Sequence, residues 1–180
     1  MESMRSEYMR MLSDCEGKLQ RTAYYLTRSQ TDAAKDLVQN TVVRGYEAYL
    51  RGQFTPGTNM LAWLQRILNN LFLTDENHRK KWETARSAEA PDPLLAVKAG
   101  IATEPEAALL SNIFSEPVEK ALMELSYEMR VCILLVDVDE LDYAQAAYVL
   151  GIPVGTVRSR LARARIRLHA LLCKQEIEQE

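Results

Sequence analysis

The chain has 180 residues, 47% of them hydrophobic, and a formal net charge of −3. This length is enough for one domain or two small ones. Its three cysteines are far apart and only two histidines occur, which argues against a zinc site and favours a reduced protein of the cytoplasm. The chain has no apolar run near membrane-spanning length, no signal-peptide core at its N-terminus, and no P-loop, nucleophile-elbow or dinucleotide motif. We therefore expect a protein that is not an enzyme, does not insert into membranes, and needs no cofactor or metal.

The first part of the chain predicts three helices, because apolar residues recur there at helical spacing. They are expected at residues 7–27, at about 31–50, and from about 60 to Trp82. The candidate capping residues are Ser29 or Thr31 for the second helix and Thr58 or Asn59 for the third. With seven Gly, six Pro and no alternating β-branched runs in the whole chain, we expect an all-α protein.

The middle of the chain, residues 83–113, differs in character from the segments on either side. It is rich in alanine, it contains three of the six prolines, and its acidic residues outnumber the basic ones. This composition predicts an irregular linker with a short helical turn near residues 105–110.

The last segment, residues 114–180, contains the sequence form of a helix-turn-helix. Asp142 can cap a short helix by accepting a hydrogen bond from the amide of Gln145, and Gln145 can bond back to complete a capping box. Gly151 can adopt the left-handed conformation that ends this helix. Pro153 stands where the next helix should begin.

The final helix has an apolar stripe on one side and arginines around the rest of its surface. The stripe is expected to pack inward and consists of Val157, Leu161, Ala164, Leu168 and Leu171. Arg158 and Arg165 flank it on one side, Arg160 and Arg167 flank it on the other, and small or polar residues face away from it. No Asp or Glu occurs between Tyr143 and Gln175.

A helix of this kind suits the major groove of DNA. Small residues permit close approach, and guanidinium groups reach phosphates and guanine edges. A solvated basic helix on the surface of a bundle is the alternative interpretation.

The segments GIPVGTVRSRLARAR and LSYEMRVCILLV resemble region 4 of the small sigma factors of bacterial RNA polymerase, the extracytoplasmic-function (ECF) class of the sigma-70 superfamily. The resemblance implies that the helix-turn-helix recognises −35 promoter DNA. The residues it assigns to this contact are Thr156, Arg158, Ser159, Arg160, Arg163 and Arg167. The chain departs from the family pattern at Ala144, Gln145 and Ala146, where Glu and Ile are usual. These positions should tune packing and partner contacts rather than the DNA-facing helix.

A second segment, DLVQNTVVRGYEAY at residues 36–49, is similar to the part of region 2 that docks on a coiled coil of the polymerase's largest subunit. The docking residues that this resemblance implies are Asp36, Leu37, Gln39, Asn40, Val43 and Arg44. The family commonly has Glu where this chain has Asn40, which puts one charged contact in doubt. A plain amphipathic surface is the alternative interpretation.

A third segment, FTPGTNMLAWLQRILNN at residues 54–70, resembles the family block that leads into the promoter-melting surface. Asn70 is followed by polar residues at 74–77, which favour a loop or frayed helix, and then by a basic cluster. Such a loop suits an unstacked base whose phosphate is held alongside. The residues assigned to −10 contact are Asn70, Thr74, Asn77, His78, Arg79, Lys80 and Lys81. A solvated basic helix end is the alternative, and Trp63 is expected in the core.

These resemblances together imply two small helical domains. Region 2 is expected at residues 1–82 and region 4 at residues 114–180, joined by the linker at 83–113. In the family the linker passes through the polymerase toward the RNA exit path, although a flexible tether explains its composition equally well.

We therefore expect an alternative sigma factor that binds core RNA polymerase and promoter DNA and directs promoter-specific initiation. An anti-sigma factor is a further expected partner, because most relatives have one, and the chain is expected to be a monomer outside the holoenzyme. The net negative charge of the chain, combined with a single basic helix, also predicts that the isolated chain binds DNA weakly. A stand-alone helix-turn-helix regulator with an N-terminal sensing domain is the main alternative, and a helical adaptor that binds only protein is a third possibility.

Overall fold

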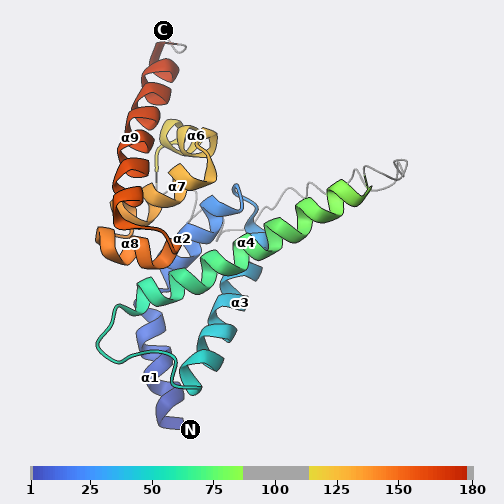
Figure 1. Ribbon diagram of the computed structural model, residues 1–180, viewed down its shortest axis with the longest axis vertical. Helices are drawn as coiled ribbons and strands as arrows, with labels where there is room; N and C mark the ends of the chain where they lie inside the picture. The colour runs from blue at the N-terminus through green and yellow to red at the C-terminus, as the bar shows by residue number, and fades with distance from the viewer. Residues whose placement is uncertain (1, 87–113, 178–180) are drawn as a thin grey trace.

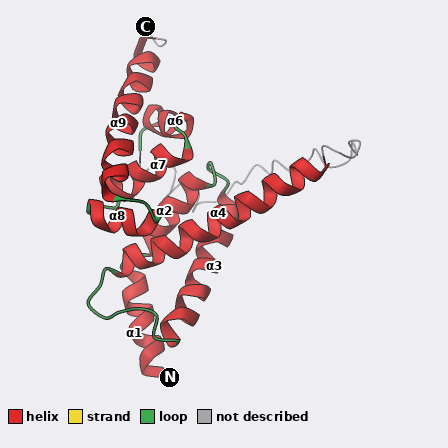
Figure 2. Ribbon diagram, viewed as in Figure 1, coloured by secondary structure: helices red, strands yellow, loops and turns green. Residues whose placement is uncertain are grey.

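The computed structural model describes residues 2–86 and 114–177, and its regular elements in these ranges are all helical (Figure 2). In chain order they are α1 (Glu2–Ser13), α2 (Glu16–Leu26), α3 (Thr31–Leu50), α4 (Met60–Arg86), α6 (Glu116–Glu124), α7 (Tyr127–Ile133), η2 (Leu134–Val138), α8 (Tyr143–Leu150) and α9 (Val154–Ile177). The expected all-α fold is confirmed. Most of the expected linker, with its short helical turn, lies outside the described residues.

The N-terminal segment forms two helices where one was expected at residues 7–27. The chain turns at Cys15, whose amide donates to the Leu12 carbonyl at 2.8 Å. Asp14 and Gly17 are poor residues for a helix interior, so a turn at this point gives up little helical stability. The turn allows Leu12 and Leu19 to be buried from two different helices, at 5% and 0% exposure.

Helices α3 and α4 start differently from one another. Asn59 caps α4, because its Oδ1 accepts from the Ala62 amide at 3.1 Å, as one of the two expected caps. Helix α3 follows Gln30 without a side-chain cap, so neither Ser29 nor Thr31 caps it. Thr31 is instead its first residue and is buried, while Ser29 adopts a positive φ of 62° in the preceding turn.

Helix α3 approaches its neighbours most closely at Gly45. A Cβ built at this position would lie 2.6 Å from the Tyr8 hydroxyl and 2.8 Å from Cδ2 of Leu64. Any larger residue would require the buried Tyr8 or Leu64 side chain to shift. The Tyr8 hydroxyl donates to the Val42 carbonyl at 2.9 Å across this contact.

The helix-turn-helix forms as expected from α8 and α9. Asp142 and Gln145 make both bonds of the capping box, at 2.8 and 3.0 Å. Gly151 ends α8 with φ at 65°, in the left-handed region. In the inward stripe of α9, Val157, Leu161, Ala164 and Leu171 are buried and Leu168 is half-buried.

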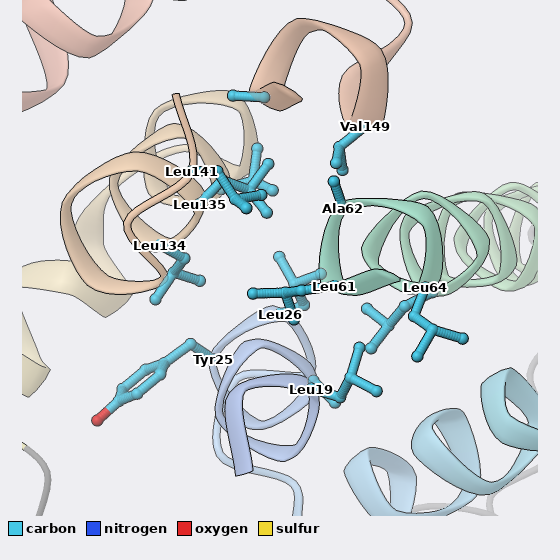
Figure 3. Close-up of a cluster of buried hydrophobic side chains, with 14 of the residues drawn as sticks. Leu19, Tyr25, Leu26, Leu61, Ala62, Leu64, Leu134, Leu135, Leu141 and Val149 are labelled. Carbon is cyan, nitrogen blue, oxygen red and sulfur yellow. The ribbon is translucent and has the colours of Figure 1, made fainter. Parts of the chain in front are cut away.

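The N-terminal helices α1–α4 and the C-terminal helices α6–α9 pack against one another and share one core (Figure 1). Helix α4 lies against α2 and α3 on one side and against α8 on another. In Figure 3, Val149 of α8 points toward Ala62 of α4, and Leu61 lies near Leu135 and Leu141. The long α4 therefore joins the two halves of the molecule.

Candidate promoter and polymerase interfaces

The outer surface of α9 presents the side chains that the sequence assigned to −35 DNA. Of these, Arg158, Ser159, Arg163 and Arg167 are exposed, and Thr156 and Arg160 are half-buried. The buried stripe fixes the rotation of the helix, since its residues anchor the opposite face in the core. The structure thus places all six residues on one element and turns four of them fully to solvent.

The arginines of α9 have different surroundings. Arg165 pairs with Asp137 of η2, with Nε 3.1 Å from Oδ2, and Arg158 lies over the ring of Tyr143 at 5.4 Å. Arg163 donates to the main-chain carbonyl of Ser159 one turn back, at 3.2 Å. The charge of Arg160 reaches Tyr127, where it lowers a pKa that burial raises to about 12. Arg160 therefore lies partly toward α7, and the guanidinium of Arg165 is already paired with the carboxylate of Asp137.

Five of the six expected docking residues lie on the exposed side of α3. Asp36, Gln39, Asn40, Val43 and Arg44 are exposed. Val43 is 51% exposed and is the one apolar side chain among these exposed polar residues. Leu37 differs from the rest of the set: it is 6% exposed and belongs to the core, so its side chain supports the helix from behind.

The expected −10 residues lie on a continuous helix. The loop or frayed helix predicted at residues 74–77 is wrong, because α4 runs unbroken from Met60 to Arg86. The unfavourable helix propensity of Thr, Asp and Asn is below about 1 kcal/mol per residue, which good helix formers on both sides outweigh. Thr74 also satisfies its hydroxyl inside the helix, by donating to the Asn70 carbonyl at 2.8 Å.

The helical form aligns the −10 candidates. Asn70, Thr74 and Asn77 follow one another at spacings of four and three residues, so they share one face of α4, and all three are exposed. His78, Arg79, Lys80 and Lys81 continue the same helix, and their side chains lie outside the described part of the structure. Trp63 is in the core, as expected, at 9% exposure.

A buried polar cluster lies where the two halves meet, and the sequence analysis missed it. Oδ2 of Asp139 accepts from Gln65 Nε2 at 2.7 Å and from Thr22 Oγ1 at 3.1 Å. Burial raises the pKa of Asp139 to about 6, against the opposing effects of these two donors and of nearby Arg21 and Lys18. Gln65 at a core position of an apolar helix was the one signal in the sequence.

Comparison with known proteins gives the family of both halves. Residues 11–84 match Sigma-70 region 2, and residues 115–168 match Sigma-70, region 4. The ECF RNA polymerase sigma factor EcfG of Rhodopseudomonas palustris is 36% identical over 78% of this chain and 72% of its own length. The ECF sigma factor SigW of Bacillus subtilis is 31% identical over 77% of this chain and 75% of its own. The chain is an ECF sigma factor of the sigma-70 family.

Solved structures agree with this assignment. The sigma factor RpoE of Bartonella quintana, in a complex with the anti-sigma factor NepR, superposes with a TM-score of 0.69 and 28% identity over 96% of this chain and 98% of its own. CnrH, in a complex with the cytosolic domain of CnrY, gives a TM-score of 0.63 and 25% identity over 94% of this chain and 90% of its own.

The family defines the activity of this sigma factor. It is a non-catalytic subunit that binds core RNA polymerase and directs transcription initiation, as the sequence predicted. Within the described residues, no helix is long and apolar enough to cross a membrane. That same part of the chain contains no group of three or more His, Cys, Asp and Glu side chains that could hold a metal ion.

Proposed function

We propose that this ECF sigma factor reads −35 DNA through the outer face of α9. The observation that carries the proposal is an exposed arginine face without carboxylates of its own, held in one rotation by a buried stripe. Arg158 and Arg163 are the candidates for base edges, and Arg167 is the candidate for phosphate contact. Thr156, Ser159 and the half-buried Arg160 complete the proposed surface.

Region 2 of the sigma factor is proposed to open and hold −10 DNA with α4. Asn70, Thr74 and Asn77 form a polar row along this helix, and amide side chains both donate and accept, so they can read a base edge. The basic residues at 78–81 are proposed to hold phosphates of the single strand. Because α4 is unbroken, the proposed region 2 extends to Arg86, which shifts the expected boundary with the linker from residue 82 to 86.

Docking on core polymerase is proposed for the exposed face of α3. Five of the six residues assigned from the family segment are available there: Asp36, Gln39, Asn40, Val43 and Arg44. An apolar residue surrounded by polar ones is a common pattern at the centre of a protein interface.

An anti-sigma factor is proposed as the partner that controls this protein, because two similar structures were determined as complexes with such factors. The site of action is proposed to be the cytoplasm, where promoters and polymerase are found, and the free sigma factor is proposed to be a monomer.

Reconstitution tests the proposed function directly. The purified chain is added to core polymerase, and transcription is measured from a library of promoter templates. Transcripts that start at a shared pair of −35 and −10 elements are expected. Initiation that does not depend on the −35 sequence would contradict the role of α9, and binding to a palindrome without polymerase would favour the stand-alone regulator.

A further inference from the structure

Region 2 and region 4 are joined by hydrogen bonds between residues far apart in the sequence. The clearest set is centred on Asp139, which follows η2 in region 4 and is 2% exposed. Its carboxylate accepts from Thr22 of α2 and Gln65 of α4, both in region 2. Gln65 also donates to Thr22 at 2.9 Å, so the three side chains form one closed cluster. Lys18 of α2 adds a bond to the main-chain carbonyl of Asp139 at 3.0 Å.

A buried arginine makes a second connection between the regions. Arg130 of α7 is 2% exposed, and its Nη1 donates to the Tyr25 carbonyl near the end of α2 at 2.8 Å. Its other guanidinium nitrogens bond to carbonyls of region 4. One guanidinium thus holds the end of α2 against α7.

A third connection joins α4 to α8 and α7. Arg66 donates to the Tyr148 carbonyl at 2.9 Å and lies 4.4 Å from the centre of the Tyr148 ring. Phe72 stacks on Tyr127 with ring centres 5.5 Å apart. These contacts come from the same helix that carries the proposed −10 residues.

The packed arrangement places the two proposed promoter surfaces too close together. Elements at −10 and −35 are about 25 base pairs apart, which is about 85 Å of straight duplex at about 34 Å per ten pairs. The distance between Asn70 and Arg158 can be bounded by a path through the molecule. The path follows α4 to Arg66, crosses the Arg66–Tyr148 hydrogen bond and continues along the chain to Arg158, and its length is at most about 50 Å. Asn70 and Arg158 are both exposed, yet in this arrangement they cannot lie on the two elements of a straight promoter at once.

From these contacts, and resting on the proposed promoter surfaces, we propose that the sigma factor closes on itself without a second protein. The Asp139–Thr22–Gln65 cluster acts as a latch between region 2 and region 4, and it must open before both promoter elements can be bound. The closed state competes with holoenzyme formation, so it lowers the apparent affinity for core polymerase by the fraction of molecules that are open.

The chemistry of Asp139 makes this latch releasable. Both donors bond to Oδ2, and Oδ1 is buried without a hydrogen-bond partner among the described residues. A buried carboxylate with one unpaired oxygen destabilises the closed state in which it is held. Asn in its place can keep both bonds through its oxygen while removing the charge. Asp139→Asn should therefore close the molecule further, and Asp139→Lys should open it, because the new cation would lie beside Lys18 and Arg21.

Distance measurement on the full chain tests the latch without reference to function. Gln53→Cys and Ala170→Cys introduce labels at exposed positions of region 2 and region 4, in a Cys173→Ser background. Cys15 and Cys132 are buried and should not react. Energy transfer between the labels should show mostly one short distance, which Asp139→Asn enriches and Asp139→Lys shifts to a long, broad distribution.

Two further variants make the measurement decisive. Asp137→Asn removes the same charge two residues away, where the carboxylate pairs with Arg165 inside region 4, and it should leave the distances unchanged. Arg66→Ala cuts a different contact of the same interface and should also lengthen the distance, which covers the case in which Asp139→Lys fails to fold. A long, broad distribution in the unmodified chain, or identical distributions for all variants, would overturn the latch.

Core binding then tests whether closure is inhibitory. Asp139→Lys or Arg66→Ala should bind core polymerase at least about fivefold more tightly than the unmodified chain, and Asp139→Asn should bind it less tightly. If the distances change as expected but core affinity does not, the inhibitory role is refuted. If no variant binds core polymerase, the proposed function fails, while the distances still decide whether the latch exists.

Discussion

At the scale of single residues, the arginines of α9 are not equivalent. Arg165 is held by Asp137, and Arg160 is half-buried toward α7. Arg158, Arg163 and Arg167 remain exposed, with the first two nearer the start of the helix. The N-terminal part of a recognition helix usually contacts the bases. Arg158 and Arg163 are therefore expected to make the base contacts that determine sequence preference.

We predict that Arg158→Ala and Arg163→Ala each weaken −35 recognition by roughly 1–3 kcal/mol and relax the preference at one base. Arg167→Ala should weaken binding evenly across sequences and reduce the salt slope by about one. Transcription from promoters with single −35 substitutions measures both effects. Arg165→Ala is the matched control and should keep the sequence preference. Retention of the full preference by Arg158→Ala would show that this face does not read bases.

Asp139 gives the closed state a dependence on pH. The pKa of its carboxyl is raised to about 6 by burial, above the ordinary value of 3.8. The closed state therefore binds a proton that the open state does not between these values. Four groups oppose this rise in pKa: the positive charges of Lys18 and Arg21, and the hydrogen bonds donated by Thr22 and Gln65. The charge of Asp139 also raises the pKa of Cys15.

We predict that acidification from pH 7 toward pH 5 increases the closed population. The protonated form is neutral and easier to bury, so closure gains stability as the pH falls through about 6 toward 4 and loses it as the pH rises. A shift of about two units corresponds to roughly 3 kcal/mol in full. The labelled full chain reports the closed fraction at each pH. Asp139→Asn should give a flat response, and an equal pH response in this variant would assign the effect to another group.

At the scale of elements, α4 carries out two tasks along its length. Its first half is buried between the regions, with Leu64 and Leu68 at 0% exposure. Its second half begins with the exposed side chains of Thr74, Asp75 and Asn77. A rigid helix holds this face at a fixed angle to the rest of region 2, which a frayed segment would not.

We predict that Asn70→Ala, Thr74→Ala and Asn77→Ala reduce open-complex formation and alter the −10 base preference, while core binding remains. An extruded base that is not held restacks and recovers a few kcal/mol. Permanganate footprinting on matched promoters measures the opening. Asp75→Ala, on the other side of the helix, is the control and should open promoters normally. Equal defects from Asp75→Ala and Asn70→Ala would argue against a specific face.

The exposed side of α3 is the second element with a testable role. We predict that Asp36→Ala together with Gln39→Ala reduces the affinity for core polymerase about 5–30-fold, the equivalent of about 1–2 kcal/mol. Competition against another sigma factor for limiting core measures the loss. Gln53→Ala, at an exposed position in the loop after α3, should compete normally. Undiminished competition by the double variant would remove α3 from the docking surface.

At the scale of the whole molecule, the charges are distributed unevenly. The net charge is −3, although α9 is strongly basic. We predict that the isolated full chain binds its promoter with a dissociation constant weaker than about 1 µM at physiological salt, in the range of non-specific binding. Electrophoretic mobility shift with and without core polymerase tests this expectation. Tight, sequence-specific binding by the chain alone would contradict both the charge argument and the closed state.

The sequence by itself determined the helical class, the helix-turn-helix and the residues that face outward from α9. These features depend on local rules: the capping box of Asp142 and Gln145, the left-handed Gly151, and the periodicity of Val157 and Leu161. Local rules misled at the start of α3, where neither Ser29 nor Thr31 is the cap, and in two further places. A single helix was expected at residues 7–27, and a break was expected at 74–77, because differences in propensity of a fraction of a kcal/mol cannot decide such boundaries.

Only the tertiary structure decided how region 2 and region 4 sit together. Neither Asp139 nor Arg130 stands out in the sequence, since a carboxylate after an apolar run and an arginine in a helix are usually exposed. Their burial depends on Thr22, Gln65 and the Tyr25 carbonyl, which reach them across long stretches of chain. Local patterns carry no information on such pairings, because the contacts arise from packing the two halves around one core.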